Sequence, residues 1–164
     1  MALPAAVLYA VALACGLRMG EILGLRWESI DFDRYQMAVS QSLQRQKGRG
    51  LVLTDTKTDR SRRTIRLPAP LIAALRVHRI RQLEEHLALG PRWQDSGLVF
   101  TSHVGTGLEP RNLHRFKAML AKAGLPDIRF HDLRHSAASL IHRTRTFESI
   151  LILPHSSRAK RKAV

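Results

Sequence analysis

The 164-residue sequence contains three separated segments in which a basic side chain could act on an anion. In the first segment, Arg18 interrupts two apolar stretches that both have helical spacing. A charge at such a position is costly unless it is paired or has a function. Glu21 follows three residues later, on the same face of a helix, and could hold Arg18 in place. Two interpretations stay open: an ion pair at the edge of the core, or an arginine positioned to bind an anion.

Lys57 belongs to the second segment, residues 54–64, within a polar turn between two short strand-like stretches. Its flexible stem would let the ammonium group reach a phosphate, and a lysine can donate a proton as well as a charge. The alternative is a solvated hairpin turn, which is the usual environment of such charged residues.

The third segment, residues 130–138, contains His131, Arg134 and His135. On a helix, His131 and Arg134 are three residues apart and share one face. The alternative without a site is a polar helix start in which Asp132 favours the helix dipole. A zinc helix built on His131 and His135 is a further rival, but that motif has a glutamate where Asp132 stands and needs a third ligand. We expect no metal and no cofactor.

The composition indicates a polyanionic partner. Lys and Arg number 27 against 13 Asp and Glu, which gives a formal net charge of +14. Nucleic acid is the first candidate partner and an anionic membrane surface the second. Hydrophobic residues make up 45% of the chain, enough for the core of one domain. The single cysteine, Cys15, excludes an internal disulfide framework and a cysteine-built zinc site, and it favours a reducing, cytoplasmic location.

The apolar residues 1–17 are predicted to form a buried helix, over about residues 4–15. A secretory signal would need a basic residue before the apolar run, whereas the first basic residue, Arg18, follows it. The run is also short for a membrane span. We therefore expect no membrane anchor.

The remaining pattern predicts a mixed α+β domain. A second helix is expected up to about Trp27, and a helix over residues 69–89 is expected to have Leu71, Leu75, Leu83 and Leu87 on one side. A turn is expected at 29–33, with strands at 36–43, 51–54 and 63–67 and a loop at 44–50. We further expect an extended piece at 98–100 and helices at 110–124 and 131–142.

Taken together, the segments 14–27, 56–68 and 130–138 resemble the catalytic domain of tyrosine recombinases, the phage integrase family. The resemblance covers roughly residues 5–141, with the segments in the family's order. It implies a mainly helical DNA breaking-rejoining domain with a small three-stranded antiparallel sheet.

The resemblance also implies a mechanism. A tyrosine attacks a DNA phosphate, a 3′-phosphotyrosyl link forms and a 5′-hydroxyl leaves, without a metal or nucleotide. Arg18 and Arg134 match the two arginines that clamp the phosphate, and Glu21 matches the residue that supports the first of them. Lys57 matches the lysine proposed as general acid, and His131 matches the histidine that assists proton movement.

Two features depart from the family pattern. His155 lies 21 residues after Arg134 and matches a further active-site position, with Pro154 in place of the usual glycine. No tyrosine follows it, because the only tyrosines are Tyr9 and Tyr35, both of which we expect to be structural.

We therefore expect a truncated form. Residues 1–142 would be a partial tyrosine recombinase catalytic domain, and residues 143–164 a degraded or disordered basic tail. The expected function is site-specific DNA recombination or integration, and the chain alone is expected to be inactive. The alternative is a non-catalytic DNA-binding remnant or regulator. Double-stranded DNA is the expected partner, and self-association, or partner recombinase chains that supply the tyrosine, stay open.

Overall fold

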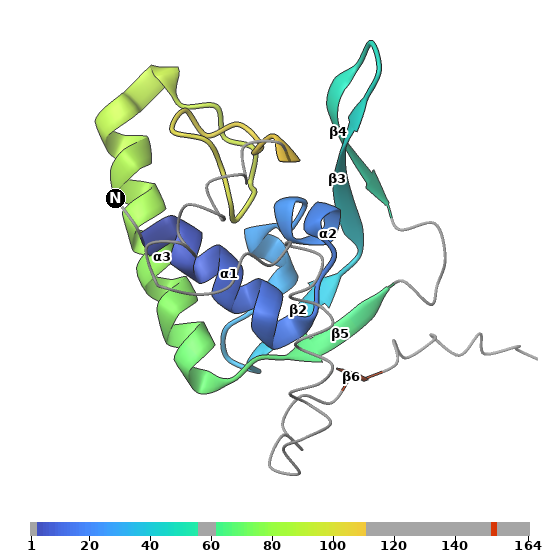
Figure 1. The fold of residues 1–164 in the computed structure, drawn as a ribbon. Coiled ribbons are helices and arrows are strands. Elements are labelled where there is room, and N and C mark those ends of the chain that lie inside the picture. Colours follow the sequence, from blue (N-terminus) through green and yellow to red (C-terminus); the bar gives the residue numbers. More distant parts are fainter. Residues whose placement is uncertain (1–2, 56–61, 111–151, 154–164) are drawn as a thin grey trace, which may run out of the picture.

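The computed structural model describes residues 3–55, 62–110 and 152–153. Helix α1 (Leu3–Cys15) lies at the centre of the fold and packs against the long helix α3 (Ala69–Leu89) (Figure 1). Its buried side chains include Val7, Leu8 and Val11. Gly16 ends α1 because its backbone φ of +58° is a conformation that residues with a Cβ adopt rarely. The predicted N-terminal helix is confirmed, and its apolar residues form part of the core.

The second helix is shorter than the sequence predicts. Helix α2 covers only Met19–Leu23, and Gly24 is its C-cap. A 3-10 turn, η1 (Trp27–Ser29), follows instead of further α-helix. A Cβ added to Gly24 would lie 2.8 Å from the backbone nitrogen of Leu43, so this position needs a glycine for α2 to approach the neighbouring strand. The prediction of a helix up to Trp27 was wrong because the helix ends at Leu23, where Gly24 packs closely against Leu43.

The central sheet is antiparallel and contains four strands of the described chain in the order β1-β2-β5-β6. The strands are β1 (Ile30–Asp31), β2 (Gln36–Val39), β5 (Arg63–Arg66) and β6 (Ile152–Leu153). The α+β class is confirmed, but this sheet has one strand more than expected. The turn predicted at 29–33 is partly strand β1, because Ile30 pairs with Met37.

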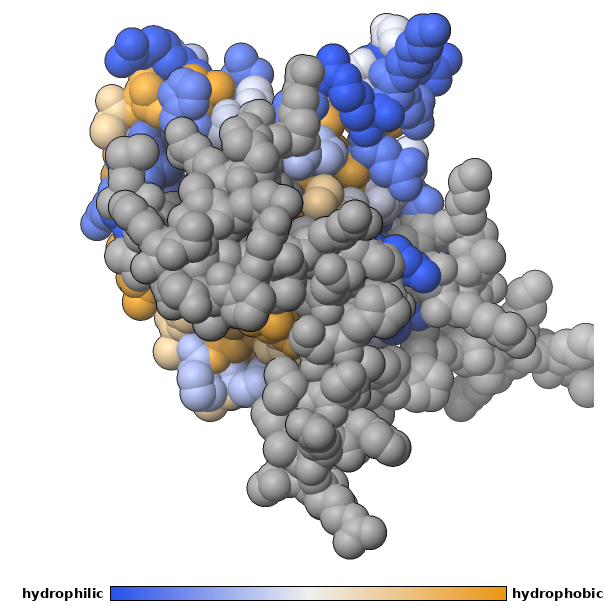
Figure 2. Space-filling view, in the orientation of Figure 1, coloured by the Kyte–Doolittle hydropathy of each residue, from blue (hydrophilic) through white to orange (hydrophobic). Residues whose placement is uncertain are grey.

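A separate two-stranded ribbon, β3 (Gln41–Gln46) and β4 (Gly50–Asp55), projects away from the body of the molecule (Figure 1). Its register runs from Gln41 opposite Asp55 to Gln46 opposite Gly50. The single strand predicted at 36–43 is therefore divided between two sheets, and the loop predicted at 44–50 is largely ribbon. Polar side chains obscured this ribbon in the sequence, because residues 44–50 are all polar or glycine and show no apolar alternation. Hydrophilic surface dominates it (Figure 2).

Helix α3 begins and ends where the sequence predicts, at Ala69 and Leu89. Pro70 lies in its first turn and Gly90, with a φ of +54°, caps its end, followed by the 3-10 turn η3 (Gly90–Arg92). Leu71 and Leu75 are buried as expected.

Leu83 and Leu87 were expected on the same side of α3, and that prediction was wrong: they are 53% and 81% exposed. At 100° per residue, the buried line of α3 continues from Leu75 to His78, and Leu83 lies roughly 120° around the helix from Leu71.

His78 and Gln82 join α3 to the extended segment at 98–100. The His78 Nε2 atom lies 2.8 Å from the Val99 carbonyl oxygen, and the imidazole stacks on Phe100 with ring centroids 5.3 Å apart. The Gln82 side chain donates to Thr101 Oγ1 at 2.9 Å and accepts from Trp27 Nε1 at 2.6 Å. Within this segment, Leu98 forms an isolated antiparallel β-bridge with Arg26, which agrees with the extended piece predicted at 98–100.

Several predictions fall outside the described residues, namely the helices at 110–124 and 131–142. The division of the chain at residue 142 stays a prediction as well. Among the described residues, no helix is both long and apolar enough to span a bilayer.

The buried His78 is expected to make stability depend on pH. Burial lowers the pKa of His78 below its usual 6.5; the hydrogen bond to Val99 and the charge of Glu85 oppose this shift, while Arg81 adds to it. The unfolded chain therefore binds more protons than the folded chain as the pH falls below about 6.5, and the free energy of unfolding should decrease there. Urea denaturation between pH 7.5 and 5.5 measures this slope.

His86 lies on the same helix but stacks on Trp93 at 5.3 Å, and it offers a matched control. H78Q should flatten the pH dependence of stability, whereas H86Q should keep that of the wild type. Equal slopes for wild type and H78Q would show that His78 does not titrate differently in the folded chain.

Candidate functional site

Arg18 lies in the tight turn between α1 and α2. Gly16 opens the turn, and the buried Leu17 anchors it in the core. Arg18 is the N-cap residue of α2 and has an extended backbone, with φ −70° and ψ 154°. Its side chain is 60% exposed, so the guanidinium group faces solvent beside the body of the domain.

Glu21 is the centre of the site. It is the third residue of α2, and its side chain is only 3% exposed. The carboxylate accepts the backbone N–H of Arg18 at 2.8 Å and the Arg18 Nη1 atom at 3.2 Å. A glutamate at this helix position commonly accepts the backbone N–H of the N-cap residue. Glu21 therefore fixes both the backbone and the guanidinium of Arg18.

Arg63, the first residue of β5, completes the site from a distant part of the chain. Its Nη1 and Nη2 atoms donate to the two carboxylate oxygens of Glu21 at 3.1 and 2.8 Å. This two-bond geometry is the one that gives arginine–carboxylate pairs their strength and specificity. The Arg63 side chain is 15% exposed, so it is much more buried than Arg18.

The electrostatics of the site keep Glu21 ionised. Burial alone would raise the pKa of Glu21, but hydrogen bonds from the Arg63 side chain and the Arg18 backbone, with both guanidinium charges, hold the pKa below its usual value. One carboxylate and two guanidiniums leave a net positive charge, and Arg18 presents it to solvent.

Cys15 lies at the end of α1, within reach of the charge on Arg63. Burial raises the pKa of the Cys15 thiol to about 12, and Arg63 opposes that shift. The thiol is protonated at neutral pH and is therefore a poor nucleophile.

The structure places two of the residues expected from the sequence. The predicted contact between Arg18 and Glu21 is present. Lys57, His131, Arg134 and His155 lie outside the described residues, and their assignments stay predictions.

Sequence reasoning assigned no role to Arg63. Its partner Glu21 is 42 residues away in sequence, and the only available signal was an arginine at the start of the predicted strand 63–67.

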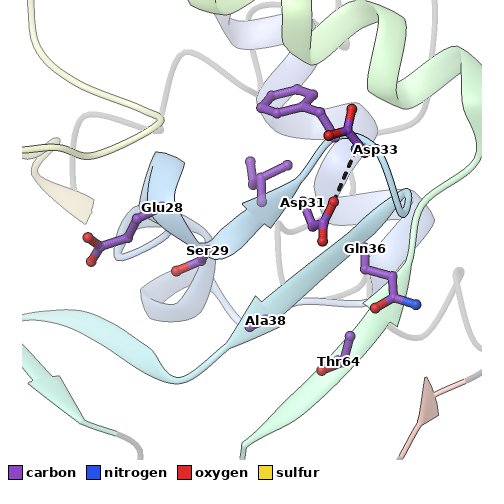
Figure 3. A pocket seen from close by; sticks show the side chains of 9 residues that line it. Glu28, Ser29, Asp31, Asp33, Gln36, Ala38 and Thr64 are labelled. Atoms are coloured by element: carbon purple, nitrogen blue, oxygen red, sulfur yellow. Dashed lines mark hydrogen bonds between the residues drawn. The ribbon is translucent and has the colours of Figure 1, made fainter.

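An open groove of about 580 Å³ lies beside strands β1 and β2 (Figure 3), and neither Arg18 nor Arg63 is among its lining residues. Its lining includes Glu28, Asp31 and Asp33, and Asp31 Oδ1 accepts the backbone N–H of Asp33 at 3.1 Å. Carboxylates repel phosphate, so this groove does not suit a polyanion. Within the described ranges, no group of three His, Cys, Asp or Glu side chains is placed to hold a metal ion.

The geometry therefore supports anion binding at Arg18. A guanidinium that a buried carboxylate holds in place can still offer its remaining N–H groups to a ligand. Such a preorganised cation suits a negatively charged oxygen, such as that of a phosphate.

Comparison with known proteins places this geometry in context. A family model described as the phage integrase family matches residues 2–145. A tyrosine recombinase XerC-like protein of Caldanaerobacter subterraneus subsp. tengcongensis is 36% identical over 144 residues, covering 80% of this chain and 37% of the relative. A putative prophage phiRv2 integrase of Mycobacterium tuberculosis is 38% identical over 138 residues, covering 82% of this chain and 34% of the relative. The chain thus spans well under half the length of these relatives.

Solved structures share the fold. The Tn1549 transposon integrase in complex with transposon right end DNA superposes with a TM-score of 0.67 at 22% identity, covering 82% of this chain and 44% of that one. The XerH site-specific recombinase bound to palindromic difH substrate gives a TM-score of 0.55 at 23% identity, covering 85% and 35%.

Replacing the two arginines should have unequal effects on stability. Arg63→Ala leaves a buried carboxylate with only an exposed partner, and removal of one member of a buried pair typically costs about 3–5 kcal/mol. Arg18→Ala removes a partner that is 60% exposed, and we expect a loss of about 1 kcal/mol or less. Urea denaturation of both variants at pH 7 measures the difference.

The double variant Arg63→Ala/Glu21→Gln is the control, because it removes the uncompensated charge together with its partner. It should be more stable than the sum of the two single changes predicts. Strict additivity, or equal losses for Arg18→Ala and Arg63→Ala, would contradict the geometry described above.

Proposed function

This chain belongs to the phage integrase family, and from that premise we propose that it binds double-stranded DNA and supplies the phosphate-activating part of a tyrosine recombinase. In this role Arg18 binds a non-bridging oxygen of the phosphate to be cleaved. Negative charge accumulates on these oxygens in the transition state, so a cation held there in advance lowers the barrier.

The observation that carries the proposal is that the two arginines differ in exposure and in their hydrogen bonds to Glu21. Arg63 directs both of its terminal nitrogens at Glu21 and is only 15% exposed, so it supports the carboxylate. Arg18 gives Glu21 one side-chain hydrogen bond and faces solvent, so it can serve a ligand. A merely structural ion pair would not require a second, largely shielded arginine in addition to Arg18.

The proposed chemistry assigns one role to each remaining residue. Arg134 is the second clamp on the phosphate oxygens. A phenolic oxygen attacks phosphorus, the bond from phosphorus to the 5′-oxygen breaks, and Lys57 donates a proton to that leaving oxygen. His131 assists the movement of protons, and His155 is a further contact to the phosphate. The segment that carries Lys57 joins β4 to β5, and β5 begins with Arg63 at Glu21.

Neither tyrosine of this chain suits the role of nucleophile. Tyr9 is 5% exposed within α1, and burial raises its pKa, which disfavours the phenolate. Tyr35 is 39% exposed, but it lies in the turn between β1 and β2, at the opposite end of the β2–β5 pair from Arg63 and the site around Glu21. We propose that the attacking tyrosine lies outside residues 1–164, in a further segment or in another recombinase chain.

A nicked suicide DNA substrate tests the chemistry directly. The unaided chain should form no covalent DNA complex, because in-line attack needs a phenol about 3–3.5 Å from the phosphorus. Addition of a partner chain that carries the tyrosine should yield a covalent band on a denaturing gel. Arg18→Ala should then reduce its rate by about 100-fold or more.

Arg92→Ala is the matched control, because Arg92 is an exposed arginine in the 3-10 turn η3, and it should keep the wild-type rate. A covalent band from residues 1–164 alone that disappears with Tyr9→Phe or Tyr35→Phe would place the nucleophile within these residues and overturn the proposal of a tyrosine outside them.

A further inference from the structure

We propose that the β3–β4 ribbon, residues 41–55, is a DNA-binding arm that holds phosphates several base pairs away from the one bound by Arg18. This inference rests on the proposed DNA-binding function and adds a second contact surface to it. The ribbon leaves the body of the molecule next to α2 and extends outward (Figure 1).

The arm, residues 41–55, has a net positive charge. It contains three basic residues, Arg45, Lys47 and Arg49, and one acidic residue, Asp55, which lies at the base and accepts a hydrogen bond from Gln41. All three are exposed. Exposed positive charge is the basic requirement for binding the DNA backbone.

The base of the arm is fixed to the domain. A Cβ added to Gly20 would lie 2.4 Å from Ser42 Oγ, and one added to Gly107 would lie 2.9 Å from Leu43 Cδ2. Leu43 is buried, and Arg45 forms an ion pair with Glu109 on the neighbouring segment. These contacts hold the first half of the ribbon in one direction relative to α2 and Arg18.

The tip of the arm, in contrast, is open. Gly48 and Gly50 have φ values of +78° and +74°, as a tight turn requires, and an added Cβ would meet no atom within 4 Å at either position. Lys47 and Arg49 lie on this turn, and the surface of the projecting ribbon is strongly hydrophilic (Figure 2). The two tip charges are therefore available to a ligand.

The reach of the arm fits a duplex bound at Arg18. Four residues separate Leu43, which packs next to α2, from Lys47, and at about 3.3 Å per residue they span roughly 13 Å. Phosphates of one DNA strand follow each other at about 3.4 Å of helix axis. The tip would therefore meet a phosphate about four positions along the duplex, or one across a groove about 12 Å wide.

The side chains of the tip favour DNA over an acidic protein as partner. Residues 44–50 contain only Gln, Arg, Lys and Gly, with no aromatic or large apolar residue. Protein interfaces depend on buried aromatic and apolar anchors, whereas contacts to phosphates need only a positioned charge.

Binding of a duplex of about 30 base pairs across a range of salt concentrations tests the arm in the full chain. K47Q/R49Q removes the two tip charges, and R34Q/R92Q is the matched control that removes two exposed charges elsewhere. Each lost phosphate contact should reduce the log–log salt slope by about 0.9. The tip variant should therefore have a slope shallower by about 2 and an affinity weaker by about 10-fold to 100-fold at 0.1 M salt, and the control should change much less.

The outcomes separate this proposal from the proposed function. A wild-type chain that fails to bind DNA, or binds it independently of salt, overturns both. Salt-dependent binding by the wild type with equal effects of the two double variants overturns the arm alone, and leaves an acidic protein surface as the partner of these charges.

Crosslinking gives a second measurement that does not depend on charge. A photoreactive group on K47C should crosslink to bound DNA in much higher yield than the same group on R92C. The native Cys15 is a poor target for the reagent because burial raises the pKa of its thiol to about 12. Equal yields from the two positions would contradict the proposal.

Discussion

The site depends on the hydrogen bonds and ion pairs that the buried carboxylate of Glu21 forms with two arginines. Removal of a carboxylate from water is expensive, and only well-aligned partners compensate for it. Here the partners come from both sides: the Arg18 backbone and side chain from its own helix, and the two terminal nitrogens of Arg63 from strand β5. The carboxylate thereby ties the turn between the first two helices to the central sheet. The hydrogen bonds to Glu21 thus position Arg18, while its guanidinium stays exposed.

The five-residue helix α2 connects this site to the rest of the fold. Its residues Gly20 and Gly24 leave room for β3, so the base of the projecting ribbon packs directly against the helix that holds Glu21. Substitution at either glycine would force the ribbon and the arginine site apart, because a Cβ would collide with β3 atoms. The position of the ribbon and the position of Arg18 are consequently not independent in this domain.

The sequence predicted those features that arise from local signals. Helix α3 begins near Pro70 and ends at Gly90, and both signals are readable without a structure. The contact between Arg18 and Glu21 follows from a spacing of three residues. Arg63 could not be predicted in its role, because its partner comes from another element and its residue type alone suggests a solvated surface. The length of the β3–β4 ribbon was missed because residues 44–50 are all polar or glycine and give no alternation. Leu83 was misplaced because the buried His78 and the half-buried Gln82, rather than leucines, continue the inward face of α3.

The measurement that tests the central claim most directly is a crystal structure of this chain bound to a DNA duplex. Our account predicts an Arg18 guanidinium nitrogen within about 3 Å of a non-bridging phosphate oxygen, while Arg63 keeps both of its hydrogen bonds to Glu21. Arg134 and His131 should lie around the same phosphate. A complex in which the DNA crosses another face of the domain, or in which Arg63 leaves Glu21 to bind the phosphate in place of Arg18, would contradict it.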